Sequence, residues 1–103
     1  MEPSIGRIVH YRLTEQDAEE INRRRTTSNS IAVRMKAALW PEGAQAHIGN
    51  EAHAGEVYPA IIVRVWGGDC INGQAFLDGN DSFWMLSRQR GTEPGDWDWP
   101  PRS

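Results

Sequence analysis

Three arginines followed by two threonines, at positions 23–27, are the residues whose types and spacing point most directly to binding chemistry. A guanidinium group forms paired hydrogen bonds with phosphate or carboxylate oxygens, and a neighbouring hydroxyl adds a further donor. Successive helical residues are rotated by about 100°, so at most two of the three arginines can reach one anion. The alternative is a solvated helix end whose charges complement the helix dipole and pair with upstream glutamates.

A second candidate is the segment 41–56, in which His47, Asn50 and His53 lie among alanines and glycines. These side chains donate and accept hydrogen bonds, and small neighbours let a ligand approach the backbone closely. Either a ligand-binding or interface loop or a packed structural loop fits this composition. The histidines are six positions apart, with only Glu51 between them as a third ligand, which matches no strong zinc pattern. We therefore expect no metal site.

Together these segments predict an anion site between the end of a helix and the following long loop. A tryptophan, either Trp40 or Trp84, is expected to stack on any aromatic part of the ligand. The predicted ligand-binding residues are Arg24, Arg25, Thr27, Trp40, His47, Asn50 and Trp84.

Catalytic patterns are not recognisable in the sequence. We find no nucleophile paired with a base, no paired carboxylates in apolar settings and no phosphate-cradling glycine loop. The glycine-containing segments 67–69 and 79–81 are typical of hairpin turns, and the aspartates at 78 and 81 are expected to bond the local backbone. His10, which alternates with Ile8, is interpreted as a core or edge histidine. The sequence thus predicts a protein that is not an enzyme and has no cofactor.

The net charge and the hydropathy of the sequence argue against nucleic acids and membranes as partners. The 103 residues carry a formal net charge of −3, whereas general nucleic-acid binding needs a basic surface. Residues 7–36 contain seven Lys or Arg against four Asp or Glu, a local charge of +3, so an anion should bind in this half. No apolar run approaches the roughly 20 residues of a membrane span, and the N-terminus does not resemble a signal peptide. We expect a cytoplasmic protein without a membrane partner.

Periodicity predicts the elements that must position these residues. Residues 5–13 form a strand and residues 15–25 a helix, with Thr14 and Asp17 as a capping box and Leu13 and Ala18 as a hydrophobic staple. Residues 31–40 fit either a helix or a strand, although their composition favours a helix. Further strands are predicted at 57–66, 70–77, 82–87 and 97–99. The first of these is apolar on both faces, which predicts a central strand with a buried Trp66.

Five tryptophans are a heavy aromatic load for a chain of this length. Most of them are expected in the core, with one or two at a site or an interface. A domain this small cannot bury them all together with a long insertion, so we also predict self-association as a homo-oligomer.

Four segments carry a resemblance to a known group: Ile-Gly-Arg-Ile-Val-His-Tyr, Val-Tyr-Pro-Ala-Ile-Ile-Val-Arg-Val-Trp, Phe-Leu-Asp-Gly-Asn-Asp and Trp-Asp-Trp-Pro-Pro. They resemble a group of small bacteriophage proteins over nearly the whole chain. The order of strand, long insertion and two hairpins is similar to SH3-like barrels. The resemblance implies one mainly β (α+β) domain over residues 1–103, with barrel strands mainly at 5–13 and 57–99 and a helical insertion at about 14–55.

Three functions are compatible with these observations. The first is a phage-encoded binding protein that sequesters a small anionic host molecule, such as a nucleotide signal of antiviral immunity. The second is a structural or assembly protein of the virion, in which the tryptophans and the long loop make subunit contacts. The third is an inhibitor directed at a host enzyme. The local positive charge and the aromatic faces favour the first.

Overall fold

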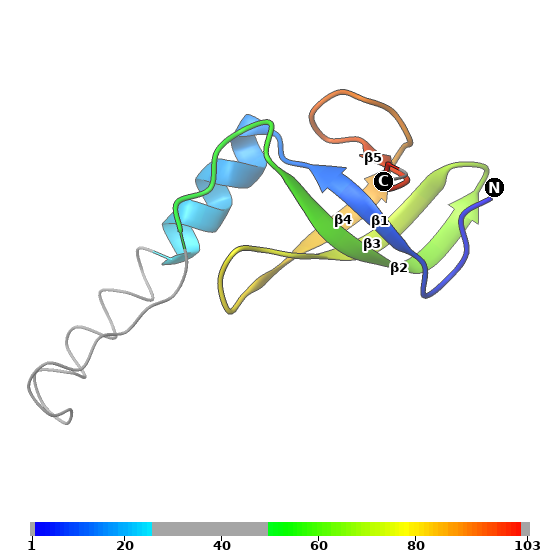
Figure 1. Ribbon diagram of the computed structural model, residues 1–103, viewed down its shortest axis with the longest axis horizontal. Helices are drawn as coiled ribbons and strands as arrows, with labels where there is room; N and C mark the ends of the chain where they lie inside the picture. The colour runs from blue at the N-terminus through cyan, green and yellow to red at the C-terminus, as the bar shows by residue number, and fades with distance from the viewer. Residues whose placement is uncertain (1, 26–49, 102–103) are drawn as a thin grey trace, which may run out of the picture.

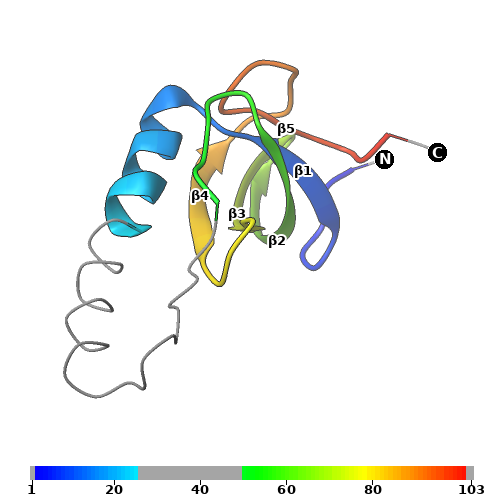
Figure 2. The same ribbon diagram turned by 60° about the vertical axis from the view of Figure 1, so that its left-hand side comes forward.

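The computed structural model describes residues 2–25 and 50–101, and these form a mainly β fold with one helix after the first strand (Figure 1). The strands are β1 (Ile8–Arg12), β2 (Val57–Gly67), β3 (Cys70–Phe76), β4 (Ser82–Arg88) and β5 (Trp97–Asp98). They build one antiparallel sheet in the order β4-β3-β2-β1-β5. Because β4 and β5 stand at the two ends of this order, strand pairing leaves the sheet open. The helix occupies residues 15–25 and lies on the β4 side of the sheet (Figure 2).

Alternation along β1 determines which side chains face the core. Val9 and Tyr11 are fully buried, whereas His10 and Arg12 point to the opposite face and are half-buried. The same period buries Phe83 and Met85 of β4 and exposes the residues between and after them. The core therefore lies on one face of the sheet, where Leu13 and the helix residues Ala18 and Ile21 close it. We call the face of the sheet that points away from this core the outer face.

The β2–β3 hairpin turns through two glycines with positive φ, Gly67 and Gly68, as the sequence predicts. At Gly68 the φ of 54° lies in the left-handed region that favours glycine. The carbonyl of Asp69 in this turn accepts a hydrogen bond of 2.8 Å from Nε1 of the fully buried Trp97. The hairpin thereby satisfies the one polar atom of the largest core side chain.

Asp17 joins three elements through one buried carboxylate. Its backbone N–H donates to the Thr14 hydroxyl oxygen at 2.9 Å, and its Oδ2 accepts the Thr14 N–H at 3.0 Å, which confirms the predicted capping box. The Tyr11 hydroxyl also donates to Oδ2, and Arg88 of β4 reaches Oδ1 at 3.4 Å. β1, the helix and β4 are therefore held together at one point.

The burial of the tryptophans differs from the prediction. β2 is the central strand, as predicted, but Trp66 is 53% exposed and the expectation that it is buried is wrong. Among the described residues the core covers β2 on one face only, through Ala60 and Ile62. Trp84 of β4 is also exposed, because it alternates with the buried Phe83 and Met85 and so points to the face that the core does not cover. The first strand also begins later than predicted, at Ile8, because Gly6 turns the chain with a φ of 91°.

The alternatives for residues 31–40, a helix or a strand, lie outside the described residues. In the part of the chain that the structure describes, no helix has the length and apolar character needed to cross a membrane.

Alkaline pH tests the buried contact between Tyr11 and Asp17. Burial, followed by the hydrogen bond and the negative charge of Asp17, raises the pKa of Tyr11 well above 10. The unfolded chain ionises this tyrosine near pH 10 and the folded chain does not, so stability must fall as the pH rises above about 10. We expect the urea midpoint to decrease between pH 9 and pH 11 and to decrease less in Tyr11→Phe.

Tyr58 provides the control for this measurement. Its pKa is also raised, mainly by burial and then by Glu56, but its side chain is only partly buried. Tyr58→Phe should therefore flatten the pH dependence less than Tyr11→Phe does. Equal slopes for the parent and Tyr11→Phe would show that Tyr11 ionises normally in the folded protein.

Candidate functional site

Arg25, the last of the three consecutive arginines, forms an ion pair with Asp81 of the same chain. Arg25 is 6% exposed, and its Nη2 and Nε donate to the two carboxylate oxygens of Asp81 at 3.0 and 3.1 Å. Its Nη1 donates to the backbone carbonyl of Asn50. Hydrogen bonding to Asp81 raises the pKa of Arg25 against the opposing effect of burial. One of the two arginines assigned to an anion is thus occupied by protein groups.

The β3–β4 turn supplies carboxylates to this region. Asn50 donates from Nδ2 to Oδ2 of Asp78 at 2.6 Å and from its backbone N–H to the Asp78 carbonyl at 3.1 Å. The prediction that the turn aspartates bond the local backbone is wrong, because Asp78 binds Asn50 and Asp81 binds Arg25. Both contacts pair groups that are distant in the sequence, which local turn chemistry does not reveal.

The remaining predicted residues do not complete an anion site within the described chain. Arg24 donates from Nη2 to the Ser82 carbonyl at 3.1 Å and lies over the Phe83 ring at 5.8 Å. Trp84 projects from the other side of β4. Thr27, Trp40 and His47 lie outside the described residues, so their part in the predicted site stays a prediction.

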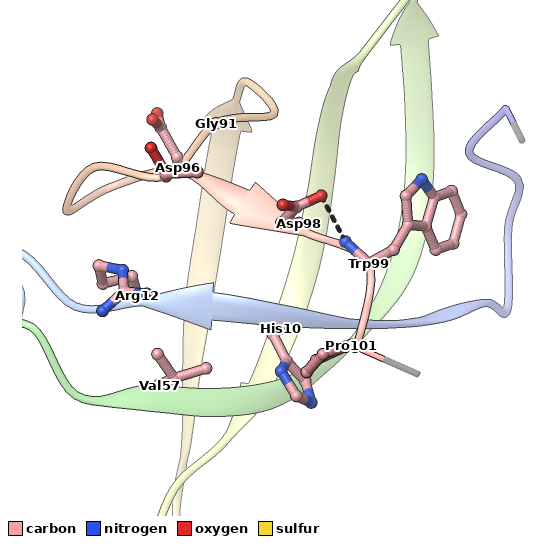
Figure 3. A pocket seen from close by; sticks show the side chains of 9 residues that line it. His10, Arg12, Val57, Gly91, Asp96, Asp98, Trp99 and Pro101 are labelled. Carbon is pink, nitrogen blue, oxygen red and sulfur yellow. Dashed lines mark hydrogen bonds between the residues drawn. The ribbon is translucent and has the colours of Figure 1, made fainter. Parts of the chain in front are cut away.

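A cleft of about 600 Å³ opens at a different place, on the outer face over β1 and β5 (Figure 3). This volume lies within the range of roughly 300–1,000 Å³ that is usual for small-molecule sites. Its lining residues are His10, Arg12, Val57, Gly91, Thr92, Asp96, Asp98, Trp99 and Pro101.

Strand register places basic and acidic residues opposite one another along this cleft. His10 of β1 is the direct partner of Asp98 of β5. Two residues along, the backbone N–H of Arg12 donates to the Asp96 carbonyl at 3.2 Å, so these two residues are also neighbours. The basic residues thus follow β1 and the acidic residues follow the β5 segment (Figure 3).

Hydrogen bonds fix these side chains without using all of their polar atoms. Nη1 of Arg12 donates to the Gly55 carbonyl at 3.1 Å, a bond that does not occupy Nε or Nη2. Oδ1 of Asp98 accepts from Nε of Arg90 and from the Trp99 N–H, each at 2.8 Å, and these bonds do not occupy Oδ2. The Arg90 bond, followed by that of Trp99, lowers the pKa of Asp98. Asp98 is therefore ionised at neutral pH.

Gly91 determines the shape of the cleft beside Asp96. A Cβ atom at this position would lie 2.1 Å from Oδ2 of Asp96, closer than any packing allows. That oxygen accepts the Glu93 N–H at 3.1 Å and is therefore held in place. The absence of a side chain at 91 is what lets the Asp96 carboxylate sit inside the loop of residues 91–96.

Trp99 lies at one end of the cleft. Its indole is turned away from Arg12 (Figure 3), makes an edge-to-face contact with Trp97 at 5.4 Å and lies under the Arg7 guanidinium at 5.6 Å. Its Nε1 is buried and has no hydrogen-bond partner among the described residues. The Trp99 indole therefore packs against the core rather than into the cleft.

The sequence contains a signal for this cleft that the interpretation of His10 as a core or edge histidine did not use. His10 and Arg12 alternate with the apolar Val9 and Tyr11, which indicates two polar side chains on the solvent face of one strand. The acidic residues at 96 and 98 share this spacing, but the pairing of β1 with β5 is not visible in the sequence. Within residues 2–25 and 50–101, no three His, Cys, Asp or Glu side chains gather as a metal site would require.

No protein-family model, curated protein or solved structure matches this chain. What the cleft can do is therefore inferred from its own geometry.

Arg25 and Arg24 form a matched pair for testing the ion pair. Arg25→Ala leaves Asp81 without its partner and removes a buried side chain, so we expect a loss of about 2 kcal/mol or more in stability. Arg24→Ala removes an exposed arginine and should change stability by no more than about 0.5 kcal/mol. Urea denaturation of both variants, followed by tryptophan fluorescence, measures the difference. Equal urea midpoints for the two variants would mean that Arg25 does not form this ion pair in solution.

Proposed function

We propose that this chain is a non-enzymatic binding domain with an SH3-like barrel and that the cleft over β1 and β5 holds its ligand. The strand order supports the barrel, because β1 pairs with β2 on one side and with β5 on the other. A parallel bridge between Arg90 and Trp97 also draws the chain after β4 towards β5. The helix follows β1, as an insertion between the first two barrel strands would.

The ligand best suited to this cleft is a small anion that also carries N–H donors. Arg12 and His10 offer hydrogen-bond donors to an anionic group, and the guanidinium can bind it through two parallel bonds. Asp96 and Asp98 can only accept hydrogen bonds when ionised, so they select N–H or O–H groups on the ligand. A nucleotide combines both features in its phosphate and in the amino and imino groups of its base. Basic and acidic residues that line one cleft from paired strands are the observation that carries this proposal.

Sequestration is the biological role that we propose for such binding. A phage protein of this kind would lower the free concentration of a nucleotide signal of host immunity by binding it without converting it. The resemblance to small bacteriophage proteins supports this context. The anion is assigned to the cleft because Arg25, in the region first predicted, is already paired with Asp81.

A role in virion assembly is the second candidate. The specific observation in its favour is the exposure of large apolar side chains on the described outer face, including Trp66, Trp84 and Leu86. Surfaces of this type usually mark protein contacts. This candidate predicts particle-associated protein in purified virions, whereas sequestration predicts free protein with bound ligand.

Calorimetry against cyclic and linear nucleotides, nucleosides and inorganic phosphate tests the proposed ligand class. We expect a nucleotide to bind more tightly than either its nucleoside or phosphate. Arg12→Gln and Asp98→Asn should each weaken it at least about tenfold, or roughly 1.4 kcal/mol, because each removes one charge-assisted contact. Arg24→Gln is the matched control and should leave the affinity unchanged. Binding to none of these compounds, or binding that only Arg24→Gln weakens, would refute the proposal.

A further inference from the structure

The outer face carries an apolar surface that spans four strands. Strand register aligns Trp84, Gln74, Ile61 and Ile8 in one row from β4 to β1. Trp84 is 44% exposed and Ile8 is 50% exposed, so both ends of the row are open to solvent. Leu86, Phe76 and Val63 extend the row to either side and are also exposed. We call these seven residues together with Trp66 the outer patch.

Trp66 is fixed at the rim of the outer patch. Its Nε1 donates to Oδ1 of the buried Asn72 at 3.1 Å, and the Arg64 guanidinium stacks over its ring at 4.0 Å. The same Asn72 oxygen accepts the Ser87 N–H at 2.7 Å, so β2, β3 and β4 are tied together beneath the ring. Trp66 therefore presents a rigid apolar surface in spite of its exposure. Tryptophan and arginine are also the residue types that dominate the energetics of interfaces.

We propose that the outer patch is the interface of a two-fold symmetric dimer of this chain. None of the eight residues of the outer patch is charged, and the charged group described beside them is Arg64, which stacks on Trp66 at the rim. In a two-fold contact the same patch of both subunits meets itself. A patch with charges of one sign would therefore repel its own copy. Gln74 lies in the row between apolar neighbours, and its amide both donates and accepts hydrogen bonds. Near a two-fold axis this amide can pair with its own copy, which is a self-complementary arrangement.

The exposed apolar area approaches what such a dimer needs. With roughly 200 Å² per aromatic side chain, the three aromatic residues of the outer patch expose about 300 Å². At roughly 60–120 Å² per aliphatic side chain, the exposed fractions of Ile8, Val63 and Leu86 add about 90–180 Å². A standard interface buries about 800 Å² on each partner, of which about 56–65%, or roughly 450–520 Å², is apolar. The outer patch, with roughly 390–480 Å² in total, therefore supplies most of the apolar part of one standard interface.

This inference does not depend on the proposed ligand. The cleft is lined by β1, the first residue of β2 and the segment 91–101, and it shares no residue with the outer patch. Dimerisation without nucleotide binding, or the reverse, would separate the two proposals.

Sedimentation equilibrium of the full chain over a range of concentrations tests the dimer. We expect the parent to be a dimer at tens of micromolar and Trp84→Glu to dimerise at least about tenfold more weakly, because it buries an unpaired charge in a symmetric contact. Gln16→Glu adds the same charge on the exposed face of the helix and should leave dimerisation unchanged. Circular dichroism checks that both variants are folded. If Trp84→Glu does not fold, Leu86→Ser on the same face provides the test with the same expected weakening.

A parent chain that stays monomeric would overturn the proposal. So would a dimer that persists undiminished in the folded Trp84→Glu or Leu86→Ser variant, because its contact would lie elsewhere. A higher oligomer that ignores these substitutions would also overturn it.

Discussion

The rest of the fold depends on one buried carboxylate, that of Asp17. It caps the helix through Thr14, accepts the hydroxyl of Tyr11 from β1 and meets Arg88 of β4. A buried carboxylate is costly unless its oxygens are satisfied, so these partners must stay in place together. Because Tyr11 is fixed inward, the alternation of β1 places His10 and Arg12 outward. A contact on the core face thereby determines which side chains the outer face presents.

The sequence predicted well the features that depend on residues close together in the chain, namely the helix cap and the β2–β3 turn. The capping box of Thr14 and Asp17 needs residues three positions apart, and a hairpin with Gly67 and Gly68 needs only a turn. Burial on β4 follows from simple alternation. The sequence could not show that β2 has one covered face in the described chain, because an apolar strand has the same composition whether its second face is covered by the same chain or by a partner. Trp66 was misplaced for this reason.

The candidate site was harder to predict because it depends on partners distant in the sequence. Arg25 looks available in the sequence, but Asp81, which is 56 positions away, neutralises it. His10 looks like a structural histidine until the pairing of β1 with β5 sets it beside Asp98. A run of arginines can be recognised from neighbouring positions in the sequence. A cleft lined by basic and acidic residues arises only when strand pairing brings distant residues together. Sequence reasoning therefore favoured the helix end, and the geometry favours the cleft over β1 and β5.

The measurement that tests this account most directly is a titration of the isotope-labelled protein with a nucleotide, followed by the shifts of its backbone amide signals. Ligand binding perturbs the amides nearest to it, so the pattern of shifts locates the site. The account predicts the largest shifts at His10, Arg12, Asp96 and Asp98, on both sides of the cleft. Shifts centred on Arg24, Arg25 and Asn50 instead would contradict it and would assign the ligand to the helix end.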